Sequence, residues 1–381
     1  MIGMKRSLTI SLILFFCISC VAQKDTGRIQ EKIKELMEKS EGIGLSVAVV
    51  KDNRICYLKT FGYNPDYDHP ERRCPLRTDA IFRIASISKT FVATAIMQLV
   101  EKGKIGLDDD ISSLLGFSVR NPYFPQVPIT VRMLLGHRSS ITDYQYGTFR
   151  NSIAMFNSAN GIDQKPFFEK SRPGTKYKYS NYGYSLLGVL IEKVSQQRFD
   201  RYISENIMHP LGLAGSYNMA DVDSTKIVWA FSYNSQKKSF AKSPQMYKSL
   251  RKELESYKLG ECAALFSPAG GMMLSIGDLT TYMMMHMNYG EYNGVRILKK
   301  ESEERLWKVY PGTKYGFGFQ HASFGLKSAD FIGHQGGAYG IHSAMFFNPK
   351  DKYGFVIICN GCNSGHDLDT EVLKLLYNSF F

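Results

Sequence analysis

The chain has 381 residues, of which 44% are hydrophobic and 22% charged, and its formal net charge is +12. This composition is typical of a soluble globular protein with one large domain or two ordinary ones. No long lysine and arginine run or nucleic-acid motif accompanies the charge, so we predict no nucleic-acid partner. We interpret the charge as a surface property suited to an anionic cell envelope.

Residues 1–22 have the pattern of a signal peptide, with a basic start at Lys5-Arg6 and an apolar run too short to span a bilayer. Two endings are open. Cleavage can follow Ala22, or Cys20 can be lipidated, because Ile18-Ser19-Cys20 partly matches a bacterial lipobox. Both predict export from a bacterial cytoplasm, to the periplasm or the medium, and the second adds a lipid anchor to the membrane.

The sequence has seven cysteines, of which five remain when those in the signal segment are removed, so at least one stays unpaired within the chain. A bridge between Cys56 and Cys74 is an open alternative. Cys359-x-x-Cys362 has no second pair at zinc-finger spacing. We interpret it as core packing rather than as a metal or redox site.

Hydrophobic spacing predicts strands at both ends of the chain and helices in the middle. A helix follows Asp25-Thr26, Thr130 caps another helix, and residues 215–262 form a long surface excursion with a helical portion near 247–257. The predicted strands cover 42–50, 54–61, 270–274, 315–320, 329–332, 342–348 and 353–360, and further helices cover 182–194, 198–207, 276–287 and 368–376.

This order predicts an α+β fold with one antiparallel sheet built from both ends of the chain. The terminal helices flank the sheet, and a mostly helical region is inserted between its halves. After a signal peptide at 1–22 we therefore expect one domain over 23–381. Its sheet region covers about 24–78 and 266–381, and its helical region covers about 79–265.

Ser86-Ile87-Ser88-Lys89 begins an apolar stretch that predicts a buried helix. Ser86 and Lys89 lie three residues apart, so their side chains share one face and can touch. A lysine that burial keeps neutral can take the proton of a serine hydroxyl and make it a nucleophile. On its own this spacing is weak evidence for a catalytic site.

Two later stretches add candidate site residues. Tyr179-Ser180-Asn181 precedes a helix, where a tyrosine can share the proton of a lysine and an amide can orient a carbonyl or the lysine. In His334-Gln335-Gly336-Gly337, the glycines let a strand edge approach a ligand, and a free backbone N–H can stabilise an oxyanion.

Ser-x-x-Lys, Tyr-Ser-Asn and His-Gln-Gly occur here in the chain order of the β-lactamase-related serine hydrolases, which include class C β-lactamases, DD-carboxypeptidases and esterases. Ile129-Thr-Val-Arg-Met-Leu-Leu-Gly-His137 also resembles a segment of that family, and the resemblance runs from about Gly44 to Asn360. It implies a β-lactamase/transpeptidase-like fold.

The resemblance also implies roles for these residues. Ser86 is the acylated nucleophile, and Lys89 with Tyr179 forms the acid–base pair. Asn181 and His334 bind the substrate. The backbone N–H groups of Ser86 and of the Gly336-Gly337 stretch form the oxyanion hole.

The chain departs from the family at two places. A serine replaces the usual glycine in His137-Arg138-Ser139-Ser140, and the 215–262 excursion has no clear match. Because of these two departures, the resemblance does not specify the pocket that holds the acyl group.

The sequence thus predicts a hydrolase that cleaves a small-molecule ester or amide, or a peptide-like substrate, through a Ser86 acyl-enzyme, with no metal and no cofactor. Acyl transfer to an acceptor other than water and a slow penicillin-binding sensor are the alternatives. Because histidine has a reference pKa near 6.5 and is mostly neutral at pH 7.5, we expect His334 to give weak β-lactamase activity and better activity on uncharged esters or amides. Any preference for carboxylate-bearing substrates should grow as pH falls through the titration of His334.

Overall fold

The computed structural model describes residues 26–66, 69, 71–146, 153–243, 247, 249–327, 329–363 and 367–381. The predicted signal peptide, with Ala22 and Cys20, lies outside the described residues. Across the described ranges, none of the helices combines the length and the apolar character needed to cross a membrane.

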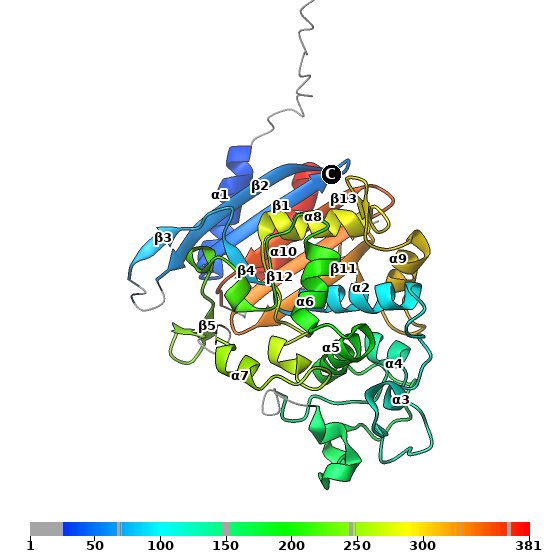
Figure 1. Ribbon diagram of the computed structural model, residues 1–381. Helices are drawn as coiled ribbons and strands as arrows, with labels where there is room; N and C mark the ends of the chain where they lie inside the picture. Colours follow the sequence, from blue (N-terminus) through cyan, green and yellow to red (C-terminus); the bar gives the residue numbers. More distant parts are fainter. Residues whose placement is uncertain are drawn as a thin grey trace, which may run out of the picture.

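An antiparallel sheet of seven strands joins the two ends of the chain (Figure 1). Strand β1 (Gly44–Lys51) lies beside strand β13 (Tyr353–Cys359), with Leu45 opposite Cys359 and Lys51 opposite Tyr353. β1 is a nearly continuous buried run because both faces of the sheet are covered. Across the sheet the strands are β10 (Gln320–Ala322), β11 (Phe331–Ala338), β12 (Ile341–Asn348), β13 (Tyr353–Cys359), β1 (Gly44–Lys51), β2 (Arg54–Pro65) and β3 (Arg73–Pro75).

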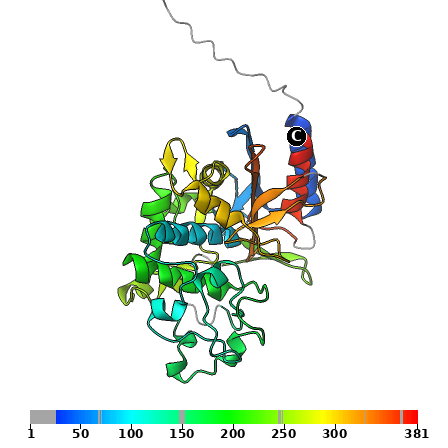
Figure 2. The same ribbon diagram turned by 90° about the vertical axis from the view of Figure 1, so that its right-hand side faces the viewer.

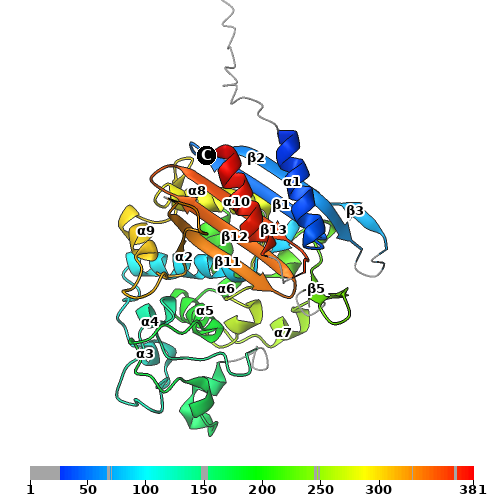
Figure 3. The ribbon, with the colours of Figure 1, turned by 180° about the vertical axis from the view of Figure 1, so that it is seen from behind.

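The terminal helices α1 (Thr26–Lys39) and α10 (Leu368–Phe380) lie side by side on one face of this sheet (Figures 2 and 3). In α1 the residues at helical spacing, Ile29, Ile33 and Met37, are buried against the sheet. The predicted α+β architecture, with terminal helices on an antiparallel sheet, is confirmed.

The opposite face carries α8 (Ile276–Met287) and, beyond it, the helical region built around α2 (Ser88–Glu101) and α5 (Asn181–Ser195) (Figure 1). α2 is buried on nearly every side, as its apolar sequence predicts. The shorter helices of this side are α3 (Ile111–Leu115), α4 (Val131–Leu135), α6 (Phe199–Ile203), α7 (Arg251–Glu255) and α9 (Lys300–Trp307). Short strands form three further pairs outside the main sheet: β4 (Ile81–Arg83) with β7 (Met273–Ser275), β5 (Phe231–Asn234) with β6 (Ser239–Lys242), and β8 (Glu291–Tyr292) with β9 (Val295–Arg296).

The 215–262 segment is only in part the surface excursion that the sequence predicts: many of its residues are exposed and α7 supplies the predicted helical portion, but other residues are buried. Its Tyr217 is buried and donates a hydrogen bond to the carbonyl oxygen of Ser88 at 2.6 Å. Glu192 of α5 anchors the end of the segment by accepting from the Gly260 N–H at 2.7 Å and from the Tyr257 hydroxyl. The sequence does not predict these buried contacts, because the buried positions between the lysines and serines follow neither strand nor helix spacing.

Two smaller expectations also change. The predicted strand at 315–320 is mostly irregular, whereas β11 runs through the glycine-rich stretch to Ala338, because those glycines pair with β12. Cys56 and Cys74 are both free and exposed, so the alternative of a bridge between them is not realised.

Candidate active site

Ser86 lies in η1 (Ala85–Ile87), a single 3-10 turn directly before α2. Ala85 has a φ of 47°, in the left-handed region that residues with side chains seldom occupy. The Ser88 hydroxyl holds this bend, because it donates to the Ala85 carbonyl oxygen at 2.6 Å and accepts from the Met272 N–H at 3.0 Å. Ser86 therefore faces a cavity rather than the core around α2.

Lys89 is fully buried, and its ammonium group reaches three acceptors. Nζ lies 3.1 Å from Ser86 Oγ, 2.8 Å from Asn181 Oδ1 and 2.8 Å from the Ala269 carbonyl oxygen. Burial lowers the pKa of Lys89 to about 7, against the opposing charge of Asp143. At neutral pH a large share of Lys89 is thus an uncharged amine within reach of the serine proton.

Asp143 is a site residue that the sequence reasoning missed. Its carboxylate accepts from the Asn181 side-chain amide at 2.7 Å and from the Asn181 backbone N–H at 2.7 Å, at the first turn of α5. A carboxylate is favoured there by the helix dipole. Because Asp143 holds the amide nitrogen, the Asn181 oxygen points at Lys89. Asp143 belongs to no recognisable motif, so no sequence signal identified it.

Tyr179 lies beside both Ser86 and Lys89. Lys89 Nζ is 4.7 Å from the centroid of the Tyr179 ring, and Ser86 is close enough to the phenol to affect its pKa. Burial raises the pKa of Tyr179 well above its usual value of 10. Tyr179 therefore keeps its proton at neutral pH, so that Lys89 is the base and Tyr179 the acid of the pair.

Gly336 and Gly337 bring β11 against the turn that carries Ser86. A side chain at Gly336 would lie 2.3 Å from Ser343 Oγ and 2.5 Å from the Ile84 carbonyl oxygen, so only glycine fits. Gly337 borders the cavity, and a side chain there would meet open space. The geometry thus leaves room for a substrate carbonyl between Ser86 and Gly337.

His334 does not behave as predicted. It is 4% exposed, its Nε2 lies 2.9 Å from the Tyr315 hydroxyl, and its Nδ1 is hydrogen-bonded to the Gln335 carbonyl oxygen. Burial and the charge of Lys89 lower the pKa of His334 to about 3. The expectation that this ring titrates near pH 6.5 against a substrate charge is therefore wrong.

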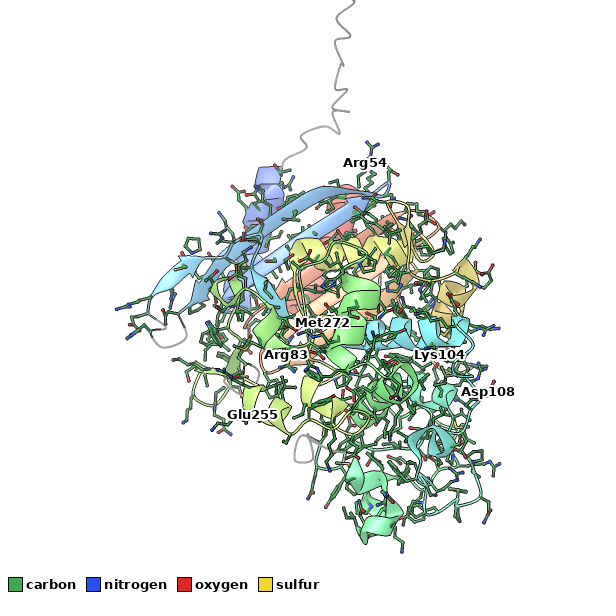
Figure 4. The ribbon with its side chains drawn as sticks, in the orientation of Figure 1. Arg54, Arg83, Lys104, Asp108, Glu255 and Met272 are labelled. Carbon is green, nitrogen blue, oxygen red and sulfur yellow. The ribbon has the colours of Figure 1, made fainter. Side chains whose placement is uncertain are left out.

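A cavity of about 500 Å³ opens beside Ser86. Its wall combines apolar and polar surface in similar shares and includes two charged residues, Arg83 and Glu253. The 215–262 segment supplies part of this wall. Figure 4 shows Arg83 near Met272, where β4 meets β7. The wall residues include Arg83, Tyr146, Ile153, Met155, Tyr179, Asn181, Tyr217, Met219, Leu250, Glu253, Leu265, Phe266, Gly337 and Tyr339.

In the parts of the chain that the structure describes, no group of three or more histidine, cysteine, aspartate or glutamate side chains is arranged to hold a metal ion.

A model of the protein family described as Beta-lactamase matches residues 29–377. The chain belongs to the Beta-lactamase family. Protein flp of Staphylococcus aureus (strain MRSA252) is 24% identical over 339 residues, which cover 87% of this chain and 62% of that protein. Penicillin-binding protein 4* of Bacillus subtilis (strain 168) is 33% identical over 199 residues, which cover 50% of this chain and 41% of that protein. The chain thus spans less than two thirds of the length of these relatives.

Solved structures of other proteins share this fold. The octameric penicillin-binding protein homologue from Pyrococcus abyssi has a TM-score of 0.72 and 26% identity, covering 93% of this chain and 78% of its own. D-amino acid amidase from Ochrobactrum anthropi SV3 has a TM-score of 0.70 and 21% identity, covering 93% and 98%. The family and the fold predicted from the sequence are confirmed, and the family contains serine hydrolases.

Proposed function

We propose that the protein cleaves an ester or amide through an acyl-enzyme on Ser86. One observation carries this proposal: the Lys89 amine lies 3.1 Å from Ser86 Oγ and has a pKa near 7. A base poised near the working pH is the requirement for activating a serine hydroxyl.

The reaction then has two stages. Lys89 takes the Ser86 proton while Oγ attacks the substrate carbonyl carbon, and the backbone N–H groups of Ser86 and Gly337 stabilise the negative oxygen that forms. Tyr179 gives its proton to the leaving group, which then departs. Tyr179 recovers a proton from Lys89. Water then attacks the acyl-enzyme in the reverse sense and releases the acid.

The cavity supports a substrate with a bulky, partly apolar acyl group. Its walls carry Met155, Met219, Leu250 and Phe266, and its volume is in the range of small-ligand sites. A neutral, buried His334 offers no net charge to a substrate carboxylate, which supports uncharged esters and amides over β-lactams. The D-amino acid amidase neighbour shares the fold, and its name fits an amide substrate for that protein.

The test uses a fluorophosphonate probe followed by intact-protein mass spectrometry and turnover of neutral p-nitrophenyl esters. We expect one adduct on Ser86 and turnover that Ser86→Ala abolishes. Adduct formation without turnover would favour the slow penicillin-binding sensor, and product appearing only with an added amine or alcohol would favour the acyltransferase. Labelling that survives in Ser86→Ala would refute the assignment of Ser86 as the nucleophile.

A further inference from the structure

Two cysteines lie on the far side of the sheet from Ser86. Cys359 is the last residue of β13 and Cys362 follows three residues later, and both are buried, with exposures of 0% and 1%. Both are free thiols, Cys359 Sγ donates to the Gly361 carbonyl oxygen at 3.3 Å, and each thiol shifts the pKa of the other. The sequence favours simple packing for this pair, but its surroundings in the fold are polar.

His342 lies beside the two thiols. In the β12–β13 register it stands opposite Cys359, so the two side chains point to the same face of the sheet. His342 and Cys362 are also close enough for each to shift the pKa of the other. Asp369 of α10 approaches the same cluster and accepts a hydrogen bond from Gln335 Nε2 at 3.2 Å.

These contacts divide the charge unequally between the thiols. Hydrogen bonds from Cys359 and His342 lower the pKa of Cys362 to about 6, while burial opposes them. The hydrogen bond to Cys362 raises the pKa of Cys359. The bond to Cys362 and the carboxylates of Asp369 and Asp367 raise the pKa of His342. These shifts favour a Cys362 thiolate beside a protonated His342, while Cys359 keeps its proton.

We propose that Cys359 and Cys362 form a peroxide-oxidisable dithiol, a reactive site separate from the Ser86 cavity. Hydrogen peroxide suits the burial of the sulfur atoms because it is small, whereas a bulky disulfide cannot reach them in this packing. The site does not depend on the proposed hydrolase function.

The reaction balances in two steps. The Cys362 thiolate attacks one oxygen of hydrogen peroxide, the O–O bond breaks, and the departing hydroxide takes the His342 proton and leaves as water. Cys359 sulfur then attacks the sulfenic acid at Cys362, the S–O bond breaks, and the hydroxide leaves as water with the Cys359 proton. Two thiols are oxidised to one disulfide, and one peroxide is reduced to two waters.

The test uses the full chain and tryptic peptide mapping. Cleavage after Lys352 and Lys374 gives a peptide, 353–374, that contains both cysteines and no others. After brief peroxide treatment and alkylation, we expect this peptide to be two hydrogens lighter and unalkylated, and dithiothreitol to restore both thiols. The exposed Cys56 and Cys74 serve as internal references and should oxidise more slowly. Oxidation of these references while 353–374 keeps both thiols would overturn the proposal.

Three variants assign the roles. Cys359→Ser should stop at a sulfenic acid on Cys362 that dimedone traps, and Cys362→Ser should leave Cys359 unoxidised. His342→Gln should slow disulfide formation by about tenfold, since a thiol of ordinary pKa is only a few per cent thiolate at pH 7. Retained ester turnover shows that each variant is folded. Oxidation of Cys359 at the wild-type rate in Cys362→Ser, or an unchanged rate in His342→Gln, would refute the roles assigned here.

Discussion

His137 holds Tyr179 from both sides. Its carbonyl oxygen accepts from the Lys178 N–H at 2.7 Å, and its Nδ1 accepts from the Ser180 N–H at 3.1 Å. The two rings are also in contact, tilted by 36° with centroids 4.3 Å apart. Because Nδ1 is the acceptor, the proton of the neutral ring lies on Nε2, which has no hydrogen-bond partner among the described residues. His137 is thus a positioning residue for the proposed catalytic acid.

Replacing His137 tests this role with a matched pair. Asparagine places an oxygen where Nδ1 stands and tolerates the φ of 54° at this position, whereas glutamine places its amide where Nε2 stands. We expect His137→Gln to lower kcat by at least about tenfold with little change in KM, and His137→Asn to retain most of kcat. Thermal unfolding of both variants is the control. Equal losses in the two variants would show that the ring only fills space.

Lys89 and Tyr179 should act on the same proton. We expect Lys89→Met and Tyr179→Phe each to lower the rate of Ser86 acylation by about a hundredfold or more. The double variant should be little worse than either single one, because the effects of coupled residues do not add. Lys89→Arg is the matched control, since arginine keeps the charge but cannot become a neutral base. Activity in Lys89→Arg, or additive losses, would contradict a shared proton.

The pH profile of kcat/KM should rise through the pKa of Lys89. The base works only when unprotonated, so activity is lost as pH falls below about 7 and is kept above it. Asp143 raises the pKa of Lys89, so Asp143→Asn should move this limb to lower pH. A profile measured with a neutral ester avoids titration of the substrate. If the acidic limb of the profile does not move in Asp143→Asn, Asp143 does not affect the pKa of Lys89.

His334 should not discriminate between neutral and anionic substrates. Its pKa of about 3 keeps the ring neutral, and Tyr315 and Gln335 occupy its nitrogens. For a matched neutral and anionic ester pair, the ratio of kcat/KM values should stay flat between about pH 5.5 and pH 8.5. A preference for the anionic ester that grows with a midpoint near pH 6.5 would restore the sequence-based expectation.

The sequence predicts most of the fold because its evidence is local. The apolar spacing of Ile29, Ile33 and Met37 specifies α1, and the unbroken apolar run after Ser88 specifies a buried α2. Ser86, Lys89, Tyr179 and Asn181 could be nominated because their motifs keep a fixed order in the chain. The structure brings these four residues together, with Ser86, Tyr179 and Asn181 lining one cavity and Lys89 buried behind it.

The remaining features depend on contacts between distant segments, which local patterns do not encode. Asp143 acts through the N-terminus of α5, and Tyr315 meets His334 from a segment without regular structure. The pKa of His334 follows from burial, which the residue type alone does not reveal. The same reason hid the polar surroundings of Cys362, since His342 reaches it only through the register of β12 and β13.

The 215–262 segment should set the size of the acyl group. Met219 and Leu250 of this segment border the cavity beside Ser86. Met219→Trp adds volume to that wall, so we expect kcat/KM for a p-nitrophenyl ester of a long acyl chain to fall by about tenfold, while the acetate ester changes little. Met219→Ala, which enlarges the cavity, is the control and should leave the acetate rate unchanged and keep the long ester active. If Met219→Trp slows both esters equally, the segment acts on the catalytic geometry and another wall of the cavity receives the acyl chain.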